Sequence, residues 1–139
     1  MTNINVIENK ISLIFQNLTI LENFKKYSKE EIENDINVRG ALERYLYLAV
    51  QATIDLSDAI ISLKNFRKPT TIRESFEILE EEKVISVDLR NKMVGMAGFR
   101  NAITHDYAKI NYDKVYDVLQ NRLGDIEEFV AEIKKYLNL

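Results

Sequence analysis

Apolar residues recur every three or four positions through most of the chain, which is the spacing that places them on one face of an α-helix. No segment shows the steady alternation of apolar and polar residues that is typical of a half-buried β-strand. We therefore predict an all-α protein with about five helices, over residues 5–27, 29–66, a short stretch after 71, 87–104 and 112–137.

The second of these stretches is unusually long, because apolar residues keep the helical spacing from Ile32 to Leu63. The periodicity predicts one continuous second helix over about residues 29–66. A periodic run of this length is typical of long bundles and coiled coils. Such a helix can pack against its own chain over one stretch and against another subunit elsewhere.

Polar residues mark the expected ends of the helices. Four predicted helices are preceded by a residue that can accept a hydrogen bond from the first helical turn: Ser28, Thr71, Ser86 and Asn111. Glu31 and Glu74 follow the first two at the spacing of a capping box. The single proline, Pro69, is expected to stop the long second helix.

The composition indicates one globular domain over residues 1–139. Hydrophobic residues make up 46% and charged residues 29% of the 139 positions, which is enough to build a core. The absence of cysteine excludes disulfides and zinc–thiolate sites, and one histidine excludes a histidine-rich metal site. We expect no metal site.

The charge and the termini narrow the class of protein further. A net charge of -3 argues against a broadly basic surface for duplex nucleic acid but leaves room for a small basic site. We find no segment apolar for long enough to span a bilayer, and the N-terminus does not resemble a signal peptide. A cytoplasmic protein without a membrane partner is the expectation.

The only histidine lies in FRNAITHDY, residues 99–107, at the predicted end of the fourth helix. On a helix, Asn101 and His105 share one face, because they are four residues apart. Arg100 and Thr104 share another face. A stripe of small residues runs beside them and would let another backbone or a ligand approach closely: Gly95, Gly98 and Ala102.

This set of side chains suits the cleavage of RNA without a metal ion. His105 can take the proton of a 2′-hydroxyl, and Arg100 can stabilise the charge that develops on the phosphate. Asn101 can orient the imidazole or donate to an oxyanion, and Tyr107 can contact phosphate or a base. The residue types alone also fit the polar end of a helix, where a histidine is stabilised by the dipole.

FRNAITHDY fits the pattern R-x(4–6)-H-x-Y, and the longer stretch GFRNAITHDYAKIN precedes a closing helix. With these features the chain resembles, over its whole length, the HepT-like branch of the HEPN superfamily. The resemblance implies a dimeric all-α bundle with two facing motifs, which acts as the ribonuclease toxin of a type VII toxin–antitoxin pair. It also implies an antitoxin partner, a minimal nucleotidyltransferase that transfers AMP from ATP onto the motif tyrosine.

Carried over to this chain, the resemblance implies that Arg100 binds and stabilises the scissile phosphate and that His105 acts as general base or acid. Asn101 would position the histidine or the substrate, and Tyr107 would contact RNA and accept AMP. Asp106 departs from the family, because many relatives have glycine there. A carboxylate at this position would either raise the proton affinity of His105 or repel RNA.

Two function classes follow from the resemblance. The first is a homodimeric endoribonuclease that needs no cofactor of its own, since ATP serves only as the AMP donor used by the antitoxin. The second is a non-catalytic module that assists a nucleotidyltransferase in binding its substrate or in regulation. The antitoxin could also inhibit by masking the toxin, without covalent change.

Several charged and aromatic residues of the predicted second helix allow a simpler interpretation. Arg39, Glu43 and Arg44 are expected to form a solvated face with pairs four residues apart, although they could instead contact RNA or another subunit. Tyr45 and Tyr47 are expected to pack against neighbouring helices, and not to stack on bases.

Overall fold

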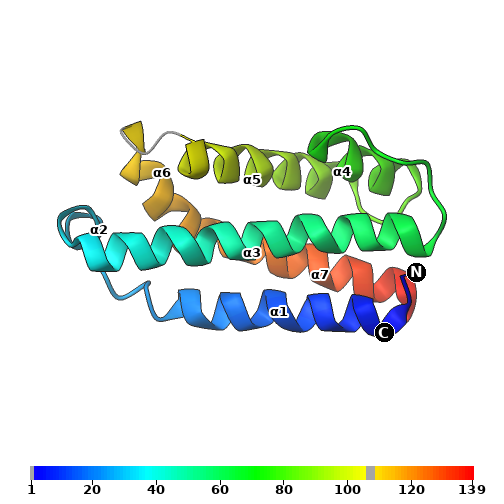
Figure 1. The fold of residues 1–139 in the computed structure, drawn as a ribbon, viewed down its shortest axis with the longest axis horizontal. Coiled ribbons are helices and arrows are strands. Elements are labelled where there is room, and N and C mark those ends of the chain that lie inside the picture. Colours follow the sequence, from blue (N-terminus) through cyan, green and yellow to red (C-terminus); the bar gives the residue numbers. More distant parts are fainter. Residues whose placement is uncertain (1, 106–108) are drawn as a thin grey trace.

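The protein forms an all-α bundle, which confirms the predicted fold class (Figure 1). This computed structural model describes the backbone of residues 2–105, the side chains of residues 2–104, and residues 109–139. The central helix α3 has α1 along one side and α5 along the other, and α7 also packs against α5. The elements are α1 Ile4–Glu22, α2 Lys29–Asn34, α3 Ile36–Leu63, α4 Ile72–Glu81, α5 Val87–His105, α6 Tyr112–Asp117, η2 Val118–Arg122 and α7 Leu123–Leu137.

The core lies where the apolar faces of these helices meet. Its largest fully buried side chains come from almost every helix and include Ile7, Ile14, Leu42, Leu56, Phe76 and Phe129. The rings of Phe76 and Phe129 meet edge to face, with centroids 5.8 Å apart, and so join α4 to α7. The inward faces predicted from the periodicity are thus confirmed for most positions.

The predicted second helix is in fact two helices, because the chain breaks at Asp35. Asp35 has extended backbone angles, φ -109° and ψ 105°. Its carboxylate accepts hydrogen bonds from the backbone N–H groups of Asn37 and Val38, as the N-cap of α3. An aspartate that caps the next helix cannot continue the previous one. Ile36, which was expected to face the core, is 69% exposed as a result.

The long helix also ends earlier than predicted, at Leu63 and not near residue 66. Asn65 adopts a left-handed conformation with φ 55°, and the N–H of Phe66 donates to the carbonyl of Ile61. This is the hydrogen bond of a Schellman motif, which closes a helix through one left-handed residue. Asn65 therefore ends α3, four residues before Pro69.

The first helix, α1, is also shorter than predicted and ends at Glu22. The next five residues form turns in which Phe24 and Tyr27 pack against each other, with ring centroids 6.1 Å apart. Phe24 also packs against Tyr45 of α3 at 6.2 Å. These aromatic contacts bind the turn to the bundle and confirm a packing role for Tyr45.

The two predicted capping boxes differ in detail. At α2 the box is complete, because the Ser28 hydroxyl accepts from Glu31 N–H and the Glu31 carboxylate accepts from Ser28 N–H. At α4 the hydroxyl of Thr71 accepts from Glu74 N–H at 3.0 Å. The Glu74 carboxylate, however, accepts from the N–H of Thr70 and not from that of Thr71. The first prediction is confirmed, and the second holds for the hydroxyl half only.

The closing helix begins where it was predicted, with Asn111 accepting from the N–H groups of Asp113 and Lys114. It is helical to Leu137, but a π-helical turn, η2, interrupts it between α6 and α7. Such turns insert an extra residue into an α-helix and are frequent at functional sites. The amide of Gln120 in this turn donates to the carbonyl of Lys25, which ties η2 to the end of α1.

Helix α3 is long and apolar enough to cross a membrane when judged by length and composition alone, contrary to the sequence-based expectation. In its most apolar window 61% of the residues are buried inside the bundle, as in the core helix of a soluble protein. This helix carries the floor of the site described next.

Candidate functional site

Residues 99–105 of the motif form the end of α5, which confirms the predicted position of this part of the motif at the end of that helix. Ser86 caps this helix by accepting from the N–H of Leu89 at 3.1 Å. One face of α5 is buried and fixes the rotation of the helix: Leu89, Met93, Met96, Phe99 and Ile103. That rotation turns Arg100 toward α3 and leaves Asn101 exposed. The side chain of His105, and Asp106 and Tyr107, lie outside the described residues.

The Arg100 guanidinium is held between two amide groups. Its Nη1 donates to Oε1 of Gln51 on α3, and its Nη2 donates to Oδ1 of Asn101 at 2.6 Å. The Nε2 of Gln51 in turn donates to Asp55, one turn further along α3, at 2.9 Å. Arg100 is therefore oriented by neutral partners. The carboxylate of Asp55 is bonded to Gln51 and not to Arg100 itself.

The aromatic ring of Tyr47 lies beside the same guanidinium. The guanidinium carbon of Arg100 is 5.8 Å from the ring centroid, and that of Arg44 is 5.6 Å away. Both distances are in the range of cation–π contacts. Tyr47 is half-buried, and Arg44 is exposed. The sequence-based interpretation of Tyr47 as a packing residue alone missed its place next to the motif arginine.

A polar stripe of α3 carries all of these partners except Asn101, which lies on α5. Its members are three or four residues apart and therefore lie on one face of the helix: Gly40, Arg44, Tyr47, Gln51 and Asp55. This spacing was visible in the sequence. The fact that the stripe faces the end of α5 was not, because it depends on how the two helices pack.

A hollow of about 430 Å³ opens beside Tyr47. It is lined by residues of α3 and the end of α5: Gly40, Glu43, Arg44, Tyr47, Ile103 and Thr104. The hydroxyl of Thr104 donates to the carbonyl of Arg100 at 2.8 Å, which steadies the last turn of α5. Polar and apolar groups share the walls, as in many small-ligand sites.

Two of the three α3 charges that were expected to pair with one another, Arg39 and Glu43, instead contact other elements. The Glu43 carboxylate accepts a hydrogen bond from the hydroxyl of Tyr112 on α6 at 3.2 Å. Burial, and after it the charge of Glu43, raise the pKa of the Tyr112 phenol. Arg39 donates to the carbonyl of Glu33 at 3.0 Å, and not to Glu43. Glu43 is thus turned toward α6, and not toward Arg44.

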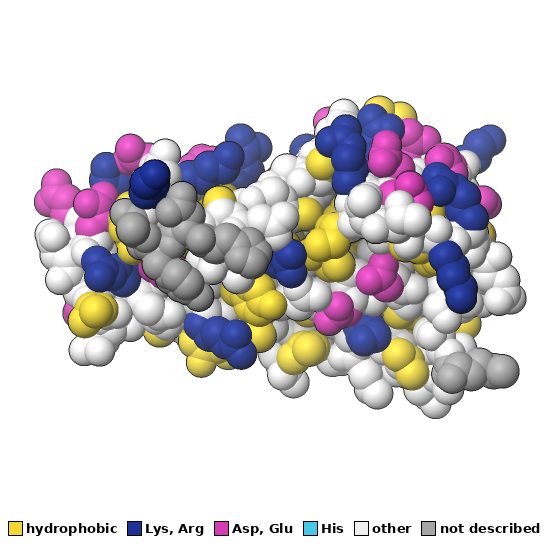
Figure 2. All heavy atoms as spheres, turned by 45° about the horizontal axis from the view of Figure 1, so that its top comes forward, with side chains coloured by type: hydrophobic (Ala, Val, Ile, Leu, Met, Phe, Trp, Pro, Cys, Tyr) yellow, Lys and Arg dark blue, Asp and Glu magenta, His cyan; other side chains and the backbone are white. Residues whose placement is uncertain are grey.

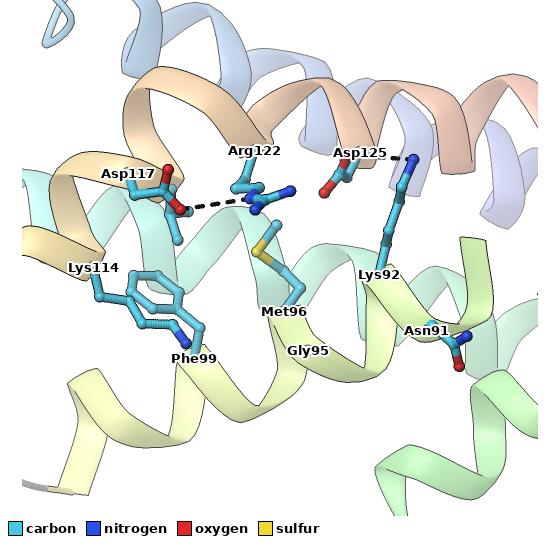
Figure 3. A pocket seen from close by; sticks show the side chains of 10 residues that line it. Asn91, Lys92, Gly95, Met96, Phe99, Lys114, Asp117, Arg122 and Asp125 are labelled. Atoms are coloured by element: carbon cyan, nitrogen blue, oxygen red, sulfur yellow. Dashed lines mark ion pairs between the residues drawn. The ribbon is translucent and has the colours of Figure 1, made fainter. Parts of the chain in front are cut away.

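The opposite side of α5 has a second, smaller groove of about 220 Å³ (Figure 3). Two of its three basic residues, Lys92 and Arg122, face carboxylates, whereas Lys114 forms no ion pair within the described residues. Arg122 pairs with Asp117 at 3.5 Å, and Lys92 lies 3.9 Å from Asp125 and 3.3 Å from Glu128. By contrast, the ion pairs formed within the described residues include neither Arg44 nor Arg100.

The stripe of small residues lies on the exposed surface of α5: Gly95, Gly98 and Ala102. No atom outside the local helix lies within 4 Å of a Cβ built on either glycine, so this surface is open. Figure 2 turns the α5 side forward and shows pale, uncharged surface along its middle, with acidic and basic side chains mixed at the α4 end. Among the described side chains, those of residues 2–104 and 109–139, no three acidic residues come together as metal ligands would.

Comparison with protein families finds one whose description is "Ribonuclease HepT-like", and its model matches residues 14–133. A tRNA nuclease HepT from Aphanizomenon flos-aquae is 30% identical over 99% of this chain and 95% of its own length. An mRNA nuclease HepT from Shewanella oneidensis is 30% identical over 75% of this chain and 78% of its own.

A similar solved structure is that of a Shewanella oneidensis HEPN toxin, tri-AMPylated and in complex with an MNT antitoxin. It superposes with a TM-score of 0.86 at 28% identity, and the match covers 94% of this chain and 97% of the toxin. A toxin–antitoxin complex with AMP-PNP gives a TM-score of 0.87 at 27% identity.

Proposed function

This chain belongs to the HepT-like ribonuclease family, and from that membership we propose that it is the endoribonuclease toxin of a type VII toxin–antitoxin pair. We propose further that residues 1–139 form one domain that acts on RNA in the cytoplasm. The observation that carries the proposal is the guanidinium of Arg100, which the neutral amides of Gln51 and Asn101 hold and which forms no ion pair within the described residues, at the end of the helix that leads to His105.

Cleavage then proceeds by transesterification within the RNA. His105 removes the proton of a 2′-hydroxyl, the oxygen attacks the adjacent phosphorus, and the 5′-oxygen leaves with a proton. Arg100 stabilises the negative charge that develops on the phosphate oxygens. Asn101 and Tyr107 position the substrate. Because the attacking group belongs to the RNA itself, the product carries a 2′,3′-cyclic phosphate and the reaction needs no metal ion.

The test is incubation of the purified protein with cellular RNA in EDTA, followed by mapping of the new ends. We expect cleavage to persist, cyclic phosphates at the 3′ ends, and no cleavage by His105→Ala. Strict dependence on magnesium, or full activity of His105→Ala, would contradict this mechanism.

The active assembly in this proposal is a homodimer in which the ends of two α5 helices approach each other. The open surface at Gly95, Gly98 and Ala102 supports this, because small residues permit close contact between helices. Two copies of Arg100 would then form a positive cleft in an acidic protein. The expected state at micromolar concentration is a dimer by light scattering.

A matched pair of glycine variants tests where the two subunits meet. Gly98→Leu should leave the monomer folded, because the glycine is in a helix with open space around it, and should weaken the dimer. Gly124→Leu makes the same change at an equally open glycine of α7 and should leave the dimer intact. Equal effects of the two variants would place the interface elsewhere.

The antitoxin in this proposal is a minimal nucleotidyltransferase that transfers AMP from ATP to Tyr107. A phosphate attached there would compete with RNA phosphate for Arg100. The AMPylated state and the bound MNT antitoxin of the Shewanella toxin support the proposal. Intact-mass analysis after incubation with the antitoxin and ATP should show AMP on the wild type and none on Tyr107→Phe. Inhibition without any change in mass would favour masking.

A further inference from the structure

We propose that Arg44, Tyr47 and the hollow beside them bind the nucleotide that adjoins the scissile phosphate on the RNA strand. The proposal rests on the ribonuclease function proposed above and extends it to a second contact with the same strand. It begins from two guanidinium groups, those of Arg44 and Arg100, that lie against one tyrosine ring; Arg44 and that ring also line a hollow.

The charge of Arg44 is available to a ligand. Its neighbour Glu43 is bonded to Tyr112 on α6, and the ion pairs within the described part of the chain do not include Arg44. The side chain is exposed, yet its guanidinium stays close to Tyr47. A planar guanidinium in such a place can bind phosphate through two parallel hydrogen bonds, or lie flat against a base.

The spacing of the two arginines suits one strand. Each guanidinium carbon lies less than 6 Å from the same ring centroid, at 5.6 Å and 5.8 Å, so the two are at most about 11 Å apart, the sum of these distances. Two neighbouring phosphates of a single RNA strand can bridge that interval. When Arg100 holds the scissile phosphate, Arg44 therefore reaches the next one along the strand.

The hollow beside Arg44 and Tyr47 suits a nucleoside. Its volume of about 430 Å³ falls within the usual range for small-ligand sites, roughly 300–1,000 Å³. Ile103 and the ring of Tyr47 offer apolar surface against which a base can pack, and base–aromatic contacts tolerate any sequence. Nothing lies within 4 Å of a Cβ built on Gly40, so that wall of the hollow stays open.

The first experiment measures binding without cleavage. A short fluorescent RNA with 2′-O-methyl groups at every sugar lacks the attacking hydroxyl and reports affinity by anisotropy at several salt concentrations. Arg44→Gln should bind about tenfold more weakly, and the slope of log affinity against log salt should fall by about one. Arg73→Gln, an equally exposed arginine of α4, should bind like the wild type.

The second experiment shortens the RNA. The shorter RNA lacks the phosphate assigned to Arg44, the one next to the scissile phosphate. With this RNA, kcat/KM of the wild type should fall about tenfold. The kcat/KM of Arg44→Gln should not change, because this variant has already lost the contact with that phosphate. Tyr47→Leu should lose affinity for the base but keep the salt slope. The melting temperature of Tyr47→Leu distinguishes a folding defect from a lost contact. If this variant does not fold, Arg44→Gln alone tests the proposal.

The outcomes separate the two proposals. Arg44→Gln within twofold of the wild type in both assays overturns the subsite, whether or not RNA is cleaved. A wild-type protein that binds RNA through Arg44 but cleaves none overturns the ribonuclease mechanism and leaves the subsite standing. A wild type that does not bind the RNA overturns both.

Discussion

The two sides of α5 treat their basic residues in opposite ways. Toward α3, Arg100 is held by the amides of Gln51 and Asn101. Toward α7, two of the three basic residues of the groove are paired with carboxylates: Lys92 lies 3.9 Å from Asp125, and Arg122 lies 3.5 Å from Asp117 (Figure 3). An amide oxygen orients a guanidinium without cancelling its charge, whereas a carboxylate does both. The chemistry of the neighbour, and not the number of basic residues, therefore decides which side of the helix can attract phosphate.

This difference reconciles a net charge of -3 with a role in binding RNA. The basic side chains that form ion pairs in the described part of the protein all lie outside the α3–α5 site, among them Arg67 with Glu81 and Arg90 with Glu80. Surface pairs of this kind contribute little to stability and attract no further anion. A small site with two uncancelled arginines is then enough to give one face a local positive potential.

The largest expected effect comes from removing the charge on each side of α5 in turn. Arg100→Gln should lower kcat/KM for RNA by about 100-fold or more, because the developing charge on the phosphate loses its stabilising cation. Arg122→Gln makes the same change in the other groove and should stay within twofold of the wild type. The measurement is steady-state cleavage of a defined RNA at fixed salt. Similar losses for both variants would show that general electrostatic attraction, and not the α3-side site, governs activity.

A smaller effect is expected when Arg100 stays but its neutral support changes. Gln51→Met keeps the shape of the side chain and removes the hydrogen bond, so kcat should fall about tenfold while the melting temperature changes little. Gln51→Glu keeps an acceptor for Arg100 but adds a negative charge beside it. In that variant kcat should recover only in part, because the carboxylate offsets some of the charge of Arg100, and KM for RNA should rise.

The comparison of the two Gln51 variants identifies a positioning role. A purely structural contribution would affect both through stability and would not split kcat from KM. The double variant Gln51→Glu/Asp55→Asn has the same net charge on the stripe as the wild type. It also keeps a hydrogen bond between positions 51 and 55, with donor and acceptor exchanged. Its KM should therefore lie between those of Gln51→Glu and the wild type. No such recovery would mean that Asp55 does not belong to the site.

The sequence was sufficient for those features that depend on local rules. Ser28, Ser86 and Asn111 cap helices as predicted, because a cap needs only its own first turn. The position of Arg100 at the end of α5 followed from the periodicity of that helix. The sequence missed a feature in which two local preferences compete, the helical spacing of apolar residues and the capping ability of Asp35. The apolar spacing continues past Asp35, and only the hydrogen bonds of its carboxylate show that a new helix begins there.

The supports of the site could not be derived from the sequence, for a different reason. Gln51 and Tyr47 are ordinary residues of a long helix until the packing of α3 against α5 brings them within reach of Arg100. Their spacing shows that they share a face, but the partner of that face depends on the whole bundle. The π-helical turn at 118–122 likewise has no signature that we recognised in the sequence.

The smallest expected effect concerns the ion pairs of the α7 side. Lys92 lies within 4 Å of three carboxylates, those of Asp88, Asp125 and Glu128, and the hydrogen bonds that it donates to Asp88 and then to Glu128 raise its pKa. Lys92→Met should therefore lower the melting temperature by a few degrees at most, because surface pairs are weak and the three carboxylates are left to repel one another. Added salt should remove most of the difference, since it screens that repulsion.

A raised pKa means that the contribution of Lys92 to stability is complete at neutral pH and is lost only as the pH rises beyond the ordinary lysine value of 10.5. Thermal melts at low and high salt measure the effect against Lys68→Met, a lysine for which the described residues show no ion pair. RNA affinity should be the same in both variants; a loss in Lys92→Met alone would extend the RNA path to the α7 side and break the contrast between the two faces of the helix.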